Sequence, residues 1–297
     1  MKVTVVITIF NCSINELEVT LKSVCNQKNV DFEIIFADDC SKIDYSFIIN
    51  KLMKNYNISY KYIRNKVNVG TVKNLLNGVY HSNGEFIKPL GCGDTFYSES
   101  SLSIFAENFE EFDVVYGKMQ GFITYKNEEK NTKYKNPLYI KPFFKDNQSK
   151  LNSLIVLGDH LSGAGLMYKR DILIKYLEKM KNKIIYVEDF VPMFVLLDGG
   201  CLKIINQKLI RYSIGTGIST AKKTDDRILN DAKVFDDFCV NEYSLNPVII
   251  KYIKYLDANS IDSKFLKFLK KIIIEPRYLI IKFMKIINTK RMYIIEK

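Results

Sequence analysis

Two apolar patterns alternate through the first 120 residues, and this alternation constrains the fold more than any other feature of the chain. The runs VTVVITIF (3–10) and FEIIFA (32–37) are continuously apolar and rich in β-branched residues, as parallel strands buried on both faces of a sheet are. Between them, apolar residues from Ile14 to Val24 recur every three or four positions, which predicts a helix. Strands and helices in this order predict an α/β domain with a doubly wound sheet and right-handed crossovers.

The remaining predicted elements follow the same reasoning. They are strands at 59–63, 85–90 and 113–119, a helix at 72–79, a hairpin or long loop at 118–150, a glycine-rich turn, short strand and helix from 162, an apolar helix after Glu188 and Asp189, two strands within 201–213, and a mainly helical remainder. In sheets of this kind ligands bind outside the carboxyl ends of the strands.

Length and composition limit the domain organisation. The chain has 297 residues, of which 47% are hydrophobic, enough for one large domain and an appendage. We expect a main domain over 1–222 and a helical C-terminal extension over 223–297. The six cysteines have no Cys-x-x-Cys spacing, which argues against a zinc ribbon or a disulfide framework and favours a reducing cytosol.

The formal charge of +11 is concentrated near the end of the chain, because residues 263–297 hold ten Lys and Arg against two acidic residues. Apolar residues recur there at helical spacing between the lysines, which is typical of an interfacial membrane helix. The alternative is a helix that packs on its own domain or on a second subunit, as in a homodimer. No apolar run is long enough to predict a membrane span, and the N-terminus predicts a strand rather than a signal peptide. We therefore expect a cytoplasmic protein at the inner face of the plasma membrane.

Four motifs stand where a strand ends or a helix begins, and each has a purely structural interpretation. Asp38 and Asp39 could cap the segment after their strand, Asn68 or Thr71 could cap a helix, Asp94 could be a turn residue between glycines, and Glu188 with Asp189 would favour a helix dipole. The functional interpretation is a ligand site, in which carboxylates accept hydrogen bonds from a ring or ribose and a helix N-terminus faces a phosphate.

Taken in order, these motifs resemble the family 2 glycosyltransferases of bacterial surface-polysaccharide synthesis. The resemblance is carried by VVITIFN (5–11), FADDCS (36–41), NVGTVKNLLNGVYHSNGEFIKPLGCGD (68–94), SGAGLMYKRD (162–171) and VED (187–189), and it covers about residues 1–220. It implies the GT-A fold, a Rossmann-like doubly wound mixed sheet flanked by helices. It also implies an inverting transfer from a nucleotide-sugar donor, most simply a UDP-hexose or UDP-N-acetylhexosamine, to a glycan or lipid-linked acceptor. It does not identify the sugar.

The resemblance also implies roles for individual residues. The nucleotide-binding set is Thr8, Phe10 (where the family often has Tyr), Asp38, Asp39, Lys73, Gly93 and Asp94. Asp39 would contact the uracil ring with Asp38 in support, and Asp94 would bind Mg²⁺ or Mn²⁺. The loop near the donor sugar and acceptor would contain His160, Gly163, Ala164, Gly165 and Glu188, Asp189 would be the catalytic base, and residues 216–220 would close over the diphosphate.

The chain departs from the family's pattern at Gly91-Cys92-Gly93-Asp94, where an Asp-rich stretch is common. Mg²⁺ is usually held by one or two carboxylates while phosphates and water fill its other positions, so one Asp can suffice when a diphosphate supplies oxygens. We therefore expect weak metal binding in the absence of donor.

Two other classes of function stay open at this point. A nucleotide-sugar-binding scaffold of a polysaccharide assembly complex would explain the missing acidic residues, but it leaves Glu188 and Asp189 without a role. A nucleic-acid-binding protein is suggested by charge alone, and no binding module or basic, aromatic strand face supports it. Because residues 1–262 carry only +3 of the net charge, we expect no nucleic-acid partner.

Overall fold

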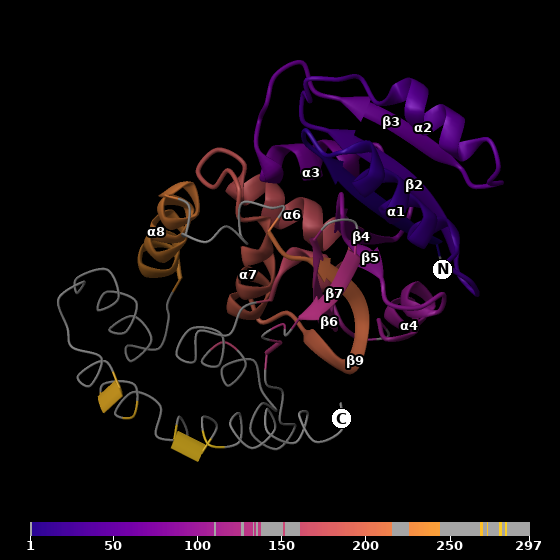
Figure 1. Cartoon of the computed structure of the whole chain (residues 1–297). Helices are drawn as coiled ribbons and strands as arrows, with labels where there is room; N and C mark the ends of the chain where they lie inside the picture. Colours follow the sequence, from indigo (N-terminus) through magenta and orange to yellow (C-terminus); the bar gives the residue numbers. More distant parts are fainter. Residues whose placement is uncertain are drawn as a thin grey trace. The chain divides into compact units, whose positions relative to one another are not determined.

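A nine-stranded mixed sheet forms the centre of the computed structural model (Figure 1). The structure describes residues 2–109, 111–125, 128–132, 134, 136–137, 151, 161–215 and 226–243, and the single residues 268, 269, 272, 279, 280 and 283. The strands are β1 (Lys2–Ile9), β2 (Asp31–Asp38), β3 (Tyr60–Arg64), β4 (Phe86–Gly91), β5 (Thr95–Phe96), β6 (Val114–Tyr125), β7 (Glu128–Thr132), β8 (Leu166–Lys169) and β9 (Leu202–Ser213). Their order is β3-β2-β1-β4-β8-β6-β9-β5, and β7 pairs with β6 off this path.

The parallel half of the sheet creates a crevice between two of its strands. β3, β2, β1 and β4 run parallel, with Val5 of β1 between Ile34 of β2 and Lys88 of β4. The chain moves outward from β1 to β2 and β3 and then returns to the other side of β1 as β4. The strand order therefore reverses between β1 and β4, and ligands bind at such switch points in open α/β sheets.

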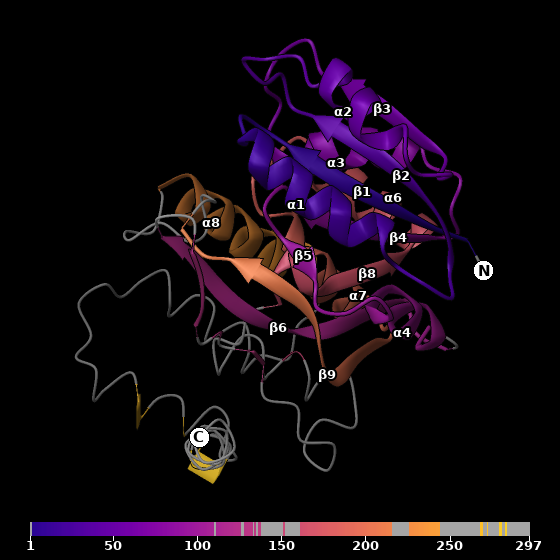
Figure 2. The same cartoon turned by 45° about the vertical axis from the view of Figure 1, so that its right-hand side comes forward.

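Helices cover both faces of this sheet (Figures 1 and 2). The helices are α1 (Ile14–Cys25), α2 (Ser46–Met53), α3 (Thr71–Tyr80), α4 (Ser101–Glu107), α6 (Arg170–Met180), α7 (Val191–Leu197) and α8 (Asp226–Asn241). One core cluster joins buried residues of α1, α2 and α4 to alternate residues of β1. On the opposite face α3 lies directly on β1 and β2, since a Cβ on Gly78 would be 2.7 Å from Val6 and 3.2 Å from Ala37. The predicted doubly wound fold is thus confirmed.

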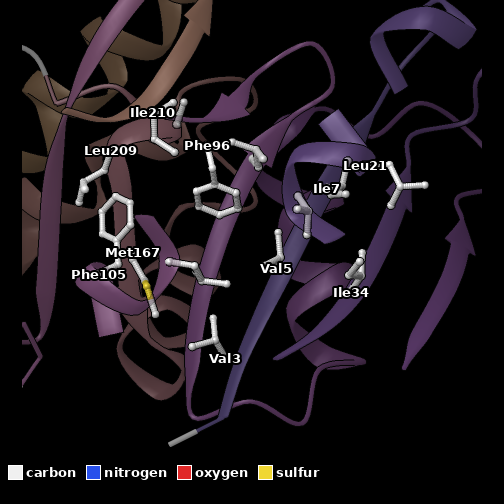
Figure 3. Packing of buried hydrophobic residues seen from close by; sticks show 14 of the residues in the cluster. Val3, Val5, Ile7, Leu21, Ile34, Phe96, Phe105, Met167, Leu209 and Ile210 are labelled. Atoms are coloured by element: carbon white, nitrogen blue, oxygen red, sulfur yellow. The ribbon is translucent and has the colours of Figure 1, made fainter. Parts of the chain in front are cut away.

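The main core lies on the α1 face of the sheet (Figure 3). The labelled side chains are Val3, Val5, Ile7, Leu21, Ile34, Phe96, Phe105, Met167, Leu209 and Ile210, each at most 8% exposed. Burying one such side chain stabilises the fold by about 1.5–3 kcal/mol. The core therefore ties the parallel strands to β8, which pairs antiparallel with β4, and to β9, which pairs parallel with β6, and it fixes where the ends of β1 and β4 lie.

The predicted elements are found, with differences in β9, α2, α4 and β5. The apolar runs form β1 and β2, and the residues around 118–132 form the predicted hairpin of β6 and β7. The two strands expected within 201–213 are one continuous strand, β9. Its register with β6 shifts, because Gly117, Lys118 and Met119 pair with Ile205, Lys208 and Ile210, so the extra residues of the bulge lie in β9. No residue range was predicted for α2, α4 or the short β5.

The chain divides into two compact units, Met1–Asn136 with Leu161–Val234, and Pro137–His160 with Phe235–Lys297. The first unit holds the sheet. Residues 216–225, which span the predicted domain boundary, and most of the predicted amphipathic segment lie outside the described residues, so both stay predictions. In the part of the chain that is described, no helix has the length and apolar character required to cross a membrane.

Candidate functional site

A pocket of about 460 Å³ opens at the switch point between β1 and β4. Its lining comes from the end of β1, the start of α1, the ends of β2 and β4, the start of α3, and two residues far along the chain: Thr8, Ile9, Phe10, Asn11, Cys12, Glu16, Asp39, Asn68, Gly70, Thr71, Asn74, Cys92, Tyr186 and Arg227. A second cavity, of about 770 Å³, lies near the start of β4 and the end of β8. The first is the candidate site because ligands bind at the carboxyl ends of parallel strands.

Asp39 connects the end of β2 to the start of α3 in the wall of this pocket. Its carboxylate accepts hydrogen bonds from the backbone N–H groups of Val69 and Gly70, at 2.8 and 2.9 Å, and from the side-chain amide of Asn65 at 3.0 Å. A carboxylate can accept about four hydrogen bonds, so one acceptor direction is left for a ligand. Asp39 therefore both shapes the loop before α3 and lines the pocket.

Asp38 has a different environment from its neighbour. It is fully buried, and its carboxylate accepts hydrogen bonds from the N–H of Ser41 at 2.9 Å and the hydroxyl of Tyr62 at 2.7 Å, with the guanidinium of Arg64 at 3.5 Å. Burial of the Tyr62 hydroxyl is the main cause of the raised pKa of Tyr62, and the hydrogen bond to Asp38 and the negative charge of Asp38 raise this pKa further. Asp38 does not line the pocket, and its contacts stabilise the turn after β2.

The other predicted nucleotide-binding residues fall into two groups. Thr8 and Phe10 line the pocket at the end of β1, and the Phe10 ring is 52% exposed and free to stack on a planar group. Lys73 is exposed on α3 and does not line the pocket. A cation is supplied there by Arg227 at the start of α8, whose guanidinium carbon lies 5.0 Å from the ring centre of Tyr186.

Gly93 and Asp94 form a tight turn behind the pocket wall. Gly93 has a φ of +99°, a conformation that favours glycine, and its N–H donates to the hydroxyl of Thr20 at 2.8 Å. Asp94 is 7% exposed and accepts a hydrogen bond from the N–H of Ser213 at 2.9 Å. Burial raises the pKa of Asp94 to about 7, although the Ser213 N–H and the charge of Lys88 both act to lower it.

Lys88 is a buried cation in the middle of β4 that the sequence reasoning missed. Its ammonium group donates hydrogen bonds at 2.6 Å to the carbonyls of Pro89 and Ala164 and lies 5.4 Å from the ring centre of Phe105. Burial lowers the pKa of Lys88 to about 7, and the nearby charge of Asp94 opposes that shift. Lys88 thus links β4 to the Gly163–Gly165 loop and offsets part of the charge of Asp94.

The described residues contain no group of three or more His, Cys, Asp and Glu side chains that could hold a metal ion by itself. At the predicted position, Asp94 is a single carboxylate with one oxygen bonded to Ser213. This donor set fits a divalent cation that takes most of its ligands from a diphosphate and water, and does not fit a metal site made by protein alone.

The Gly163–Gly165 segment lies against Glu188 and Asp189. It forms a short 3₁₀ turn (Gly163–Gly165), and a second 3₁₀ turn (Glu188–Phe190) precedes α7. A Cβ on Gly163 would be 2.4 Å from the carboxylate of Glu188 and 3.9 Å from Cβ of Asp189, so a larger residue there would require the Glu188 carboxylate to move. The structure therefore brings the predicted sugar loop and the predicted base together. His160 and residues 216–220 lie outside the described residues.

A buried carboxylate on α8 holds the segment before Glu188. Asp231 is 1% exposed and accepts hydrogen bonds from the backbone N–H groups of Ile185, Tyr186 and Val187, at distances of 2.6 to 3.1 Å. The carbonyl of Ile185 in turn accepts from the N–H of Val72 at 3.0 Å. The same segment thus contacts α3, reaches the pocket through Tyr186 and leads into the predicted base.

Four residues described here were not among the predicted site residues, and only two of them had a signal in the sequence. Lys88 could have been noticed as a charge inside an apolar run, and Asn74 as an amide on the apolar face of a helix, where it donates to the carbonyl of Ala37 at 2.9 Å. Arg227 and Asp231 lie in a polar helical stretch with no motif, so only the fold brings them to the site.

The sequence of the chain matches one family model and one known glycosyltransferase sequence. Residues 4–177 match the family model described as glycosyl transferase family 2. Over 86 residues the sequence is 35% identical to abequosyltransferase RfbV of Salmonella typhimurium strain LT2. That stretch is 28% of this chain and 26% of the abequosyltransferase, so it spans about a quarter of the relative's length.

Two solved structures share the fold. One is S. aureus TarS 1-349 in complex with UDP-GlcNAc, with a TM-score of 0.60, 18% identity, and coverage of 95% of this chain and 81% of that chain. The other is the mannosyltransferase PcManGT from Pyrobaculum calidifontis in complex with GDP-Man and Mn²⁺, with a TM-score of 0.56, 12% identity, and coverage of 94% and 73%. At these identities the similarity concerns the fold alone.

Proposed function

Because the chain belongs to glycosyl transferase family 2, we propose that it transfers a sugar from a nucleotide diphosphate donor to a hydroxyl of a glycan or lipid-linked acceptor in cell-surface polysaccharide synthesis. The proposed donor is a UDP-hexose or a UDP-N-acetylhexosamine. The matched residues, 4–177, include the strands that form the pocket and the Gly163–Gly165 turn.

The main support for a donor site is the pocket at the switch point between β1 and β4. Its wall offers an exposed aromatic ring in Phe10, a carboxylate acceptor in Asp39, the start of α3, and a cation in Arg227. These groups suit the parts of a nucleoside diphosphate, since a ring stacks on a base, a carboxylate accepts a ring N–H, and a helix start or a guanidinium favours phosphate. A uracil base with its ring N–H is the simplest match to the remaining acceptor direction of Asp39.

Asp189 is the proposed base. It takes the proton of the acceptor hydroxyl while the hydroxyl oxygen attacks the anomeric carbon, and the bond from that carbon to the diphosphate breaks on the opposite side. This single displacement inverts the configuration at the anomeric carbon. The Gly163–Gly165 turn, which lies against Glu188 and Asp189, would line the space for the donor sugar and acceptor.

Mg²⁺ or Mn²⁺ is the proposed cofactor, held by Asp94 and by oxygens of the donor diphosphate, where it would stabilise the charge of the leaving group. The side chain of Asp94 must lose a proton to bind a cation, and its pKa of about 7 makes that step accessible near neutral pH.

The proposed place of the reaction is the cytoplasmic face of the plasma membrane, where a lipid-linked acceptor would be present. The basic C-terminal region supports this proposal, and so do the exposed apolar side chains of Leu279, Ile280 and Phe283. Cations and apolar side chains together favour binding to an anionic lipid surface. Co-sedimentation of the full chain with anionic vesicles, but not with neutral ones, is the expected result.

The first experiment is a thermal-shift screen of UDP, GDP, CMP and dTDP, each with Mn²⁺ and with EDTA. We expect UDP with Mn²⁺ to raise the Tm of the wild type by several degrees, and EDTA or D94N to remove most of that rise. The control is D31N, an exposed aspartate at the start of β2, at the opposite end of the strands from the pocket. If no nucleotide changes the Tm, the pocket is not a donor site.

Turnover separates an enzyme from a binding scaffold. Release of UDP from a UDP-sugar, with water or a soluble glycan as acceptor, is expected in the wild type and is expected to be lost in D189N, while the UDP-dependent Tm rise is kept. Equal Tm rises and no UDP release in either protein would favour the scaffold.

A further inference from the structure

Two thiols meet in the wall of the candidate pocket. The sulfur atoms of Cys12 and Cys92 are 2.7 Å apart, and both residues line the pocket. Cys12 follows the end of β1 and Cys92 follows the end of β4, and these two strands are neighbours in the sheet. The contact therefore lies at the switch point, two residues before Asp94.

The backbone on both sides of this contact is fixed. The hydroxyl of Tyr45, a side chain that is 1% exposed, donates a hydrogen bond to the carbonyl of Cys12. The N–H of Cys92 donates to the carbonyl of Thr8 at 3.2 Å. The approach of the two sulfur atoms is thus built into the fold. Because a disulfide bond is about 2.05 Å long, the two sulfur atoms need to approach by less than about 1 Å to form one.

We propose that Cys12 and Cys92 form a redox modification site in the wall of the pocket, which takes low-molecular-weight disulfides as its oxidant. The thiolate of one cysteine attacks a sulfur of the oxidant, forms a mixed disulfide and releases one thiol. The second cysteine then attacks the protein sulfur of the mixed disulfide, closes the Cys12–Cys92 bond and releases the second thiol. The protein gives up two electrons and two protons, and the oxidant becomes two thiols.

Nucleotide and oxidant compete for access to the Cys12 and Cys92 sulfur atoms. This part of the inference rests on the proposed function. A nucleotide in the pocket covers both sulfur atoms, because Cys12 and Cys92 lie in the same lining as Phe10 and Asp39. If only the empty pocket reacts, oxidation slows by a factor of one plus the ratio of UDP concentration to its Kd, so UDP at about nine times Kd slows it about tenfold.

The test treats the reduced full chain with oxidised glutathione at pH 8 and follows intact mass and peptide maps. Wild type is expected to lose the mass of two hydrogen atoms, to yield a peptide pair joined through Cys12 and Cys92, and to recover with dithiothreitol. C12S and C92S are expected to stop at a glutathione adduct. C25S, which removes another half-buried cysteine, is expected to behave as wild type.

A persistent glutathione adduct on wild-type Cys12 or Cys92, a disulfide between other cysteines, or no reaction at either residue would overturn the proposal. Peptide mapping of the wild type decides this even if a serine variant fails to fold. The UDP arm separates the two ideas. If the Cys12–Cys92 disulfide forms equally fast with and without UDP, the modification site is supported and the nucleotide pocket is not. If UDP raises the Tm but no disulfide forms, the nucleotide pocket is supported and the modification site is not.

Discussion

Replacing Asp231 should lower the free energy of unfolding by a large amount, and alanine should lower it more than asparagine. Its buried carboxylate is the acceptor for three successive backbone N–H groups, from Ile185 to Val187, and these groups have no helix or strand partner of their own. Alanine removes both oxygens and leaves three N–H donors without the acceptor that the Asp231 side chain, itself 1% exposed, supplies. Asparagine keeps the shape and one acceptor oxygen but removes the charge.

The expected size follows from the energetics of such contacts. Hydrogen bonds to a charged group contribute about 1.5–3 kcal/mol each, and buried donors without an acceptor cost about 1–3 kcal/mol each. The three bonds share two oxygens and do not add, so we expect D231A to lower the free energy of unfolding by about 4 kcal/mol and D231N by about 2 kcal/mol. The matched control is D237N, an exposed aspartate on the same helix, which should change stability by less than about 0.5 kcal/mol.

Urea unfolding followed by circular dichroism, with midpoints compared at a common m-value, measures these differences. The same proteins are then assayed for UDP release at low temperature, where all are folded. Because the segment held by Asp231 leads into Asp189, D231N should lose more activity than its folded fraction explains. The reasoning is refuted if D231A and D237N have the same midpoint.

Two further predictions test other contacts. G70A should lower the stability of the fold strongly, because Gly70 has a φ of +85° and a Cβ there would be 2.3 Å from the side chain and 2.8 Å from the carbonyl of Ile185. G199A, at a φ of +81° with nothing within 4 Å, should lower the stability by only about 1–2 kcal/mol. Equal unfolding midpoints for the two variants would contradict the close contact at Gly70. Asp94 has a folded-state pKa of about 7, above its unfolded value, so the folded chain holds a proton that the unfolded chain releases. In EDTA, wild type should therefore lose stability relative to D94N as the pH rises from about 4 through 7, by an amount on the order of 4 kcal/mol. Parallel pH profiles of the free energy of unfolding for the two proteins would show that Asp94 is not a buried carboxyl group.

The parallel half of the fold was predictable because its signals are local. The continuous apolar runs that became β1 and β2 are long enough to exclude exposed strands, and the residues that follow them, such as Asp39, must then lie at the carboxyl edge of the sheet. Thr8 and Phe10, whose roles the family resemblance implied, also lie at the end of β1 and line the pocket.

The other half of the site depends on contacts that the sequence does not encode locally. Two strands were predicted within 201–213, but the polar residues Asn206 and Gln207 are exposed on one continuous strand, β9, and Asn206 accepts a hydrogen bond from Lys118 of the neighbouring strand. Asp231 meets its partners across 44 to 46 residues of chain. A partner at that separation is chosen by the packing of α8, which no pattern within the helix predicts.

The charge balance behind the pocket bears on how the proposed cation would bind beside the Gly91–Asp94 turn, which has one acidic residue. Lys88 lies close enough to Asp94 to lower the pKa of Asp94, so the interior already compensates part of the carboxylate charge. A divalent ion would therefore meet little net negative charge from the protein and would bind weakly alone. A diphosphate brings the missing negative charge and most of the ligands. Metal and donor should consequently bind together, each raising the affinity for the other by the same factor.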